Sequence, residues 1–476
     1  MFQAVYGISR GKVDVILQKL KSSGTKFPVS DCRGCHEPIN KMTEERNLMR
    51  SHIDKYPKYE SHYTRRDSNG IYLPSHLNMK KMYDEYKNEN VGKGGSYELF
   101  KLVFKETGYK FKKPKIDTCK ICDTFQINIK QCKNEIERVA LQRNYDDHKA
   151  MADFAYLQKK EDKESILKNN EKTVLVFNLQ KVLNSPSIST NVACYKRLLA
   201  TYNLTIRDCS VIGGTECYMW HEAIGGRGSN QIASCLYKKL NSLPPHVSHV
   251  ITDSDTCGGQ NRNVNMAIML SLVTSVRDTL KVIDQKFLLP GHTHLECDAD
   301  HAKIEKAKKE TNISLMVPRD WYQFVRTVRG KKPFKVVVMT QQDFYSFSDF
   351  LQSELIKKNT DINGEKINRL QIKWLRFQKE FGIFQFKYSL KDSDDFRTMD
   401  WRRNRRGRPF STQKRSLNLS YNSSLPINQL KKKDLLSLLP LIPEECHQFY
   451  EDLATSHRSF GNEVYESEDH SEGEDP

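Results

Sequence analysis

Acidic residues in the middle of the chain have a spacing that could bring their carboxylates together around divalent cations. Asp255 follows the apolar segment 247–252, and Asp298, His301 and Glu305 come about 45 residues later, spaced by three and four. On a helix that spacing places all three on one face. Mg²⁺ and Mn²⁺ prefer oxygen ligands, and pairs of these ions support phosphoryl transfer. For the helix alone, the alternative is an ordinary charged helix with a capping Asp.

Cysteines at zinc-ligand spacing form a second candidate site. Cys119 and Cys122 have the CxxC spacing of a zinc knuckle, and a His lies in the helix expected after them. The expected ligands are Cys119, Cys122 and His148, with Cys132 or His62 as the fourth. A weaker candidate site comprises Cys32, Cys35 and His36. The alternative in both places is buried thiols beside a surface His.

The charge of the chain favours a polyanionic partner. Lys and Arg total 76 against 59 acids, which gives a formal charge of +17, although the last 16 residues carry seven acids and no Lys or Arg. A basic body attracts nucleic acid through counterion release, and the alternative is a solvated basic surface. The residues expected to contact DNA are Arg402, Arg403, Arg405 and Arg406.

Two classes of protein are disfavoured. The chain has no apolar run of the ~18–20 residues that a membrane span needs, and its start interleaves charged and apolar residues, unlike a signal peptide. Twelve cysteines in such a chain are better explained as metal ligands and buried thiols than as a disulfide framework. We therefore expect neither a membrane protein nor a secreted one.

The elements that must position these residues change in type near residue 172. Before it, the pattern predicts helices over 42–56, 78–89, 96–107 and 134–168. After it, the pattern predicts strands over 173–179, 194–207 and 210–223, a helix over 229–240, a strand over 247–252, a helix over 263–280, a strand over 282–289 and a helix over 296–310. A further strand is expected over 335–339, and a final helix begins at Lys431–Lys433.

Three strands, then a helix, a strand, a helix, a strand and a helix match the order of the ribonuclease H-like fold. In that fold, metal-binding acids lie on the first strand, at the end of the fourth strand and on a later helix. The corresponding positions are Asn178, Asp255 and the helix with Asp298, Asp300 and Glu305. The expected fold class is α+β (mixed α/β): a ribonuclease H-like central domain with a mixed sheet flanked by helices, and an N-terminal helical, zinc-binding region.

Several blocks of the sequence resemble a large, mostly uncharacterised, arthropod-rich family of animal proteins of transposable-element origin, with a ribonuclease H-like DDE-transposase core. The blocks are residues 53–57, 61–63, 72–73, 81–83, 114–123, 255–263, 290–292, 298–306 and 435–439. The more specific ones are Cys-Gly-Gly-Gln-Asn and Asp-x-Asp-x₄-Glu. The resemblance implies ancestry in a DNA transposase.

One position departs from the family pattern, which has Phe-Asp-Leu-Gln on the first strand. This chain has Phe177-Asn178-Leu179-Gln180. Asn offers one neutral oxygen where Asp offers a charged pair, so a ligand shared between two cations would lose a full negative charge. Asp253 or Asp300 are the acids that offer partial compensation.

The expected function is therefore that of a transposon-derived DNA-binding protein, nuclear or otherwise cytoplasmic, whose catalysis is impaired at Asn178. The alternatives are an active metal-dependent nuclease or transposase that uses Mg²⁺ or Mn²⁺, and a protein-interaction scaffold without nucleic-acid binding. We also expect structural Zn²⁺ and a DNA partner, with a homodimer as one candidate oligomeric state. The expected organisation is a helix-turn-helix remnant with a Cys/His loop (1–40), the helical zinc region (41–170), the ribonuclease H-like domain (171–345), a basic extension (346–460) and a disordered acidic tail (461–476).

Overall fold

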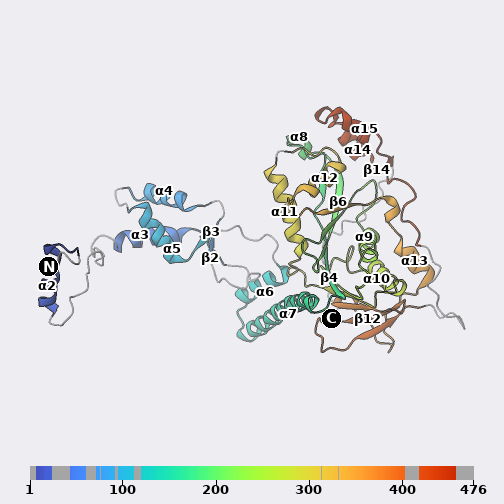
Figure 1. The fold of residues 1–476 in the computed structure, drawn as a ribbon, viewed down its shortest axis with the longest axis horizontal. Coiled ribbons are helices and arrows are strands. Elements are labelled where there is room, and N and C mark those ends of the chain that lie inside the picture. The colour runs from blue at the N-terminus through green and yellow to red at the C-terminus, as the bar shows by residue number, and fades with distance from the viewer. Residues whose placement is uncertain are drawn as a thin grey trace. The chain divides into compact units, whose positions relative to one another are not determined.

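The computed structural model of the 476-residue chain describes residues 7–23, 43–60, 71–74, 77–91, 95–111, 119–311, 313–330, 332–402 and 417–456. The chain divides into two compact units, Met1–Thr118 and Cys119–Pro476. Each unit has its own apolar core, and each is described separately below (Figure 1).

The first unit is mainly helical. Its helices are α2 (Arg10–Ser23), α3 (Thr43–Lys55), α4 (Met79–Glu89) and α5 (Tyr97–Thr107), and its short strands are β1 (Tyr59–Glu60), β2 (Ile71–Leu73) and β3 (Lys110–Phe111). Asn78 and Ser96 accept hydrogen bonds from backbone N–H groups at the starts of α4 and α5, as N-cap residues do. The core packs Met49 and Ile53 of α3 against aromatic residues of α4 and α5. The predicted helices over 42–56, 78–89 and 96–107 are confirmed.

The second unit is built on one ten-stranded mixed sheet. Along the sheet the order is β10-β7-β6-β4-β8-β9-β11-β12-β13, and β5 pairs with β6. The strands are β4 (Lys172–Leu179), β5 (Leu183–Ser185), β6 (Leu199–Asp208), β7 (Thr215–His221), β8 (His249–Ser254), β9 (Val282–Phe287), β10 (Lys335–Val338), β11 (Trp374–Phe377), β12 (Ile383–Lys387) and β13 (Arg397–Asp400). Strand β6 runs antiparallel to both of its neighbours, β4 and β7. Strands β4, β8 and β9 run parallel to one another, so their carboxyl ends lie at the same edge of the sheet.

Helices cover both faces of this sheet. The helices of the second unit are α6 (Lys120–Gln131), α7 (Glu135–Lys168), α8 (Asn191–Cys194), α9 (Ser229–Asn241), α10 (Val264–Val276), α11 (Glu296–Glu310), α12 (Pro318–Thr327), α13 (Phe347–Glu354), α14 (Gln429–Leu436) and α15 (His447–Glu451). The short strands β14 (Ile427–Asn428) and β15 (Thr455–Ser456) pair near the last two helices. Figure 1 shows α11 on the opposite side of the strands from α9 and α10.

Strand β4 explains this two-sided covering. Leu175 and Phe177 lie in the core shared with α9 and α10, whereas Val174 and Val176 lie in the core shared with α7 and α11. A strand with both faces buried needs apolar residues at successive positions, as residues 174–177 provide. The predicted α+β class and the predicted strand and helix order over residues 172–310 are thus confirmed, with the short β5 and α8 added.

Two boundaries differ from the prediction. Helices α6 and α7 belong to the unit that begins at Cys119, whereas the prediction placed residues up to 170 with the N-terminal helices. The reason is packing, since Ala152 and Ala155 of α7 contact β4 residues in one apolar cluster. The predicted basic extension also contributes β11, β12 and β13 to the sheet, through antiparallel pairing of β11 with β9.

Within the described ranges, none of the helices has the length and apolar character to cross a membrane. Of residues 1–40, where a helix-turn-helix remnant was expected, the structure describes residues 7–23, which contain the helix α2 beginning after Ser9. The acidic tail lies outside the described residues.

Candidate metal centre and the acidic edge of the sheet

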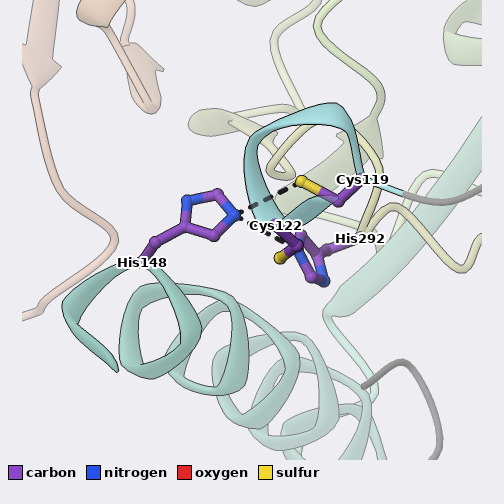
Figure 2. A group of neighbouring side chains, drawn as sticks. All are labelled: Cys119, Cys122, His148 and His292. Atoms are coloured by element: carbon purple, nitrogen blue, oxygen red, sulfur yellow. Dashed lines mark hydrogen bonds between the residues drawn. The ribbon is translucent and has the colours of Figure 1, made fainter. Parts of the chain in front are cut away.

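Four side chains from distant parts of the second unit point at one another: Cys119, Cys122, His148 and His292 (Figure 2). One ligand atom from each lies within 4.8 Å of all the others. Sγ of Cys119 is 3.4 Å from Nε2 of His148, and Sγ of Cys122 is 3.4 Å from Nε2 of His292. The two Nε2 atoms are 3.2 Å apart. These four residues can hold a metal ion.

The spacing of the four atoms matches a small tetrahedral site. With Zn–S near 2.3 Å and Zn–N near 2.0–2.1 Å, tetrahedral geometry puts two nitrogens about 3.4 Å apart and a sulfur about 3.6 Å from a nitrogen. The observed separations of 3.2 Å and 3.4 Å are close to these values. Four protein ligands also leave no position open for a substrate, as in structural zinc sites.

Local structure brings the first three ligands together. Cys119 is the N-cap of α6 and Cys122 lies in its first turn, so the CxxC spacing sets both sulfurs at one end of the helix. His148 is on α7, which packs along α6 through a contact between Phe125 and Tyr145, whose ring centroids are 6.0 Å apart. Tyr145 precedes His148 by one helical turn, so this contact directs His148 toward the start of α6.

A tight turn brings the fourth ligand. The N–H of His292 donates to the carbonyl of Leu289 (3.0 Å), which closes a turn with Pro290 and Gly291 at its centre. Gly291 has φ +74°, as the third residue of a type II turn requires. A Cβ on Gly291 would lie 2.6 Å from both Cα and Cβ of Cys119. Glycine therefore allows the turn to lie directly against the first metal ligand.

The protonation of the centre suits a cation. Burial, with a contribution from Cys119, raises the pKa of Cys122 to about 12, and burial lowers the pKa of His148. The Cys122 thiol is thus neutral unless a positive charge is present, and His148 favours the neutral form that binds metals. Cys119, Cys122 and His148 are buried, and His292 is partly buried.

Of the two expected fourth ligands, Cys132 is not part of this group. Cys132 ends α6, and its Sγ donates to the carbonyl of Asn134. Ten residues of helix separate it from Cys122, so it lies at the opposite end of α6 from the centre. The other candidate, His62, lies outside the described residues, as does the weaker site of Cys32, Cys35 and His36.

The second candidate site lies at the carboxyl ends of β4 and β8. Nδ2 of Asn178 donates to Oδ1 of Asp298 at 3.0 Å, so the first-strand position and the α11 position are in direct contact. Val176 pairs with Asp253 in the parallel register of β4 and β8. Continuing this register by two residues brings Asn178 level with Asp255. The three positions therefore lie near the same part of the sheet edge.

Each carboxylate there already has hydrogen-bond donors. Asp298 accepts the Leu295 N–H (3.0 Å) at the start of α11, in addition to the Asn178 amide. Asp255 accepts the Cys257 N–H (2.9 Å) and the Asn261 amide (2.6 Å). In the part of the chain that the structure describes, neither acid belongs to a group of three or more His, Cys, Asp or Glu side chains close enough to share a metal ion. A two-cation Mg²⁺ or Mn²⁺ arrangement does not fit these residues.

The expected position of Glu305 near this site is not found. Along α11, Asp298 contacts β4 and His301 contacts Thr205 of β6 (3.0 Å), so the helix crosses the sheet away from β4. Seven residues of helix amount to about 10 Å. Glu305 is exposed at that distance from Asp298.

The two acids that offered compensation are both buried away from Asn178. Asp300 is fully buried and accepts from Arg207 (2.9 Å), Thr215 (2.9 Å) and Lys303 (2.8 Å). Asp253 is buried beneath α7, where burial raises its pKa to about 6. Neither carboxylate faces Asn178 in place of the missing acid.

Of the four arginines expected to contact DNA, Arg402 lies within the described residues. Arg402 pairs with Asp400 (2.8 Å) and with Glu380 (3.4 Å). Arg403, Arg405 and Arg406 lie outside the described residues.

Comparison of the chain with protein-family models, with curated proteins and with solved structures finds no match.

Proposed function

We propose that this chain is a DNA-binding protein of transposable-element origin with a ribonuclease H-like core, in which phosphoryl-transfer chemistry is impaired at Asn178. The strand order β7-β6-β4-β8-β9 supports the fold assignment, because β6 lies antiparallel between β4 and β7 while β8 and β9 run parallel to β4. Helices α9 and α10 follow β7 and β8, and α11 follows β9. The sequence blocks that resemble the transposase family support the proposed origin.

The contact between Asn178 and Asp298 carries the proposal of impaired catalysis. Two carboxylates at 3.0 Å would repel each other unless a cation lay between them. The Asn178 amide instead donates a hydrogen to Asp298, so the carboxylate is satisfied without a cation. The substitution replaces a charge that would attract metal with a neutral donor that competes with it.

A cleavage assay tests this proposal. Purified chain and the Asn178→Asp variant are incubated with labelled duplex DNA and Mg²⁺ or Mn²⁺. We expect no measurable cleavage by the unaltered chain and tighter Mn²⁺ binding by Asn178→Asp, because that substitution restores the negative charge. Asp255→Asn in the Asn178→Asp background should abolish any cleavage gained. Cleavage by the unaltered chain as fast as by Asn178→Asp would establish the active-enzyme alternative.

DNA binding is tested by its dependence on salt. The affinity for duplex DNA should fall steeply with rising salt, because each neutralised phosphate releases counterions. An affinity that is weak and insensitive to salt would instead favour the scaffold alternative.

We also propose that the Cys119–Cys122–His148–His292 centre binds one structural zinc ion. The set of two sulfurs and two nitrogens, the short separations and the absence of a carboxylate among the four ligands support this choice of metal. Cys122→Ser should lower the zinc content from about one per chain to near zero, because metal binding requires the full ligand set. Cys132→Ser is the matched control and should keep the zinc, because Cys132 lies at the other end of α6. Equal zinc content in the two variants would refute the ligand set.

A further inference from the structure

The metal centre and the sheet-edge site are joined by one short connection, from the end of β9 at Phe287 to the start of α11 at Glu296. His292 lies in this connection, six residues before Asp298. We propose that occupancy of the metal centre sets the position of Asp298, so that the metal centre controls the sheet-edge site. This inference rests on the proposed zinc centre and on the proposed role of the Asn178 site.

The first half of the connection depends on the metal ligands. The turn closed by Leu289 and His292 lies against Cys119, because Gly291 leaves no side chain between them. His292 itself faces Cys122 and His148 across the centre. A bound cation would join this turn to both α6 and α7. Without one, the contacts that join these side chains are thiol–imidazole and imidazole–imidazole contacts, which are weak.

The second half of the connection is held by the same helix, α7. Lys159 donates to the carbonyl of His294 (2.9 Å) and pairs with Glu296 (2.8 Å), and Lys163 also pairs with Glu296. Lys159 follows His148 by eleven residues, or about three helical turns, so both lie on one face of α7. The side chain of Lys159 is only 5% exposed, and burial lowers its pKa. Helix α7 thus braces the connection at His292 and again at Glu296.

Asp298 responds to any movement of this connection. One of its oxygens accepts the N–H of Leu295, the last residue of the connection, and the other accepts the amide of Asn178 on β4. Leu295 is buried in the same apolar cluster as Ala152 and Ala155 of α7. A shift of α7 against the sheet therefore moves Leu295, and with it the backbone donor that orients Asp298. Asp298 is reached through α7 and the turn, with no direct contact to the metal ligands required.

Hydrogen exchange on the full chain tests the inference. Amide exchange is measured by mass spectrometry for the zinc-loaded protein and after zinc removal with a chelator. We expect exchange across residues 288–298 to speed up at least tenfold on zinc removal, while β6, in the middle of the sheet, changes less than twofold. Unchanged exchange over 293–298 after verified zinc loss would overturn the inference, and so would an equal increase over β6, because the metal would then support the whole unit.

Mn²⁺ binding to the Asn178→Asp variant gives a readout that a merely structural role would not produce. We expect Mn²⁺ to bind the sheet edge at least tenfold more tightly when the metal centre holds zinc than when zinc has been removed. Lys159→Met in this background should weaken Mn²⁺ binding even with zinc bound, and Lys159→Arg should restore most of it. Equal Mn²⁺ affinity with and without zinc would overturn the inference and leave the proposed function intact. If Asn178→Asp binds no Mn²⁺ in either state, the proposed role of the Asn178 site fails, and so does the metal control of it, whatever the exchange result.

Discussion

Substitution of Gly291 by Ala is the sharpest test of the metal centre, because it leaves all four ligands in place. The new Cβ would lie 2.6 Å from Cα and Cβ of Cys119 and 3.2 Å from its backbone nitrogen. Ordinary carbon–carbon contacts are about 3.5–4.0 Å, so backbone must move by about 1 Å. The left-handed φ of +74° adds a conformational cost of roughly 1–2 kcal/mol for alanine. With about 1–3 kcal/mol for overpacking, the total strain is about 2–5 kcal/mol.

This strain should appear as lost metal affinity. Zinc–ligand distances tolerate about 0.2 Å, so a 1 Å separation of the turn from Cys119 cannot be absorbed with all four ligands bound. If the strain is relieved by release of the metal, zinc affinity should fall by at least about 30-fold, since each 1.4 kcal/mol is tenfold. The measurement is a competition titration with a chromophoric chelator. Gly258→Ala is the control, because a Cβ there has no atom within 4 Å and its φ is not positive. Equal zinc affinity in Gly291→Ala and the unaltered chain would refute this account of the turn.

The other predictions concern charge. Burial raises the pKa of Asp253 from 3.8 to about 6, so the stability that this residue contributes is full below about pH 4 and is lost as pH rises through 6. Asp253→Asn removes this dependence. In denaturant titrations its effect on the free energy of unfolding should therefore be more favourable at about pH 7.5 than at about pH 4.5, by about 2 kcal/mol. The pKa of Asp284 is lowered to about 2 by hydrogen bonds from His249 and Arg376, which outweigh burial, so Asp284→Asn should destabilise the protein by about 3–5 kcal/mol at neutral pH and by less as pH falls toward 2. In DNA binding, Arg402→Ala should leave the slope of log affinity against log salt nearly unchanged, because Arg402 is already paired with two acids. If the cluster contacts phosphates, the slope should fall by about one for each of its other members. Those members are Arg403, Arg405 and Arg406.

Most elements of the second unit are predictable from local pattern. Short segments with neighbouring apolar residues predict strands, and such segments are Val174–Phe177 in β4, Val250–Ile251 in β8 and Val282–Ile283 in β9. Strands β11–β13 were missed because basic residues interrupt their apolar pattern. Arg376 and Lys387 are tolerated there because Arg376 pairs with Asp284 and Lys387 donates to backbone carbonyls. Such partners are far away or irregular in sequence, so local pattern cannot supply them.

The metal centre shows the same limit at the level of one ligand. CxxC spacing and a His on the following helix identify three ligands, because α6 and α7 are consecutive and pack together. His292 is 144 residues beyond His148, and only the folded sheet brings its turn to α6. The available signal was Pro290-Gly291, which predicts a tight turn immediately before a His. Sequence distance made Cys132 a more natural choice, although a rigid helix holds it away from Cys122.

The acids of the sheet edge show why residue type alone does not define a site. Asp253 and Asp255 are two residues apart, yet the first lies inside β8 beneath α7 and the second lies past the end of the strand, where backbone and amide donors reach it. Asp298 and Asp300 differ similarly, because on a helix two residues apart point in nearly opposite directions. Asp298 faces Asn178, whereas Asp300 is enclosed by Arg207, Lys303 and Thr215. Asp300 is already paired with Arg207 and Lys303, and Asp253 is buried inside β8, so neither carboxylate is placed to compensate at Asn178. The lost charge at residue 178 is therefore uncompensated by these neighbours, and the Asn178→Asp variant is the direct way to restore it.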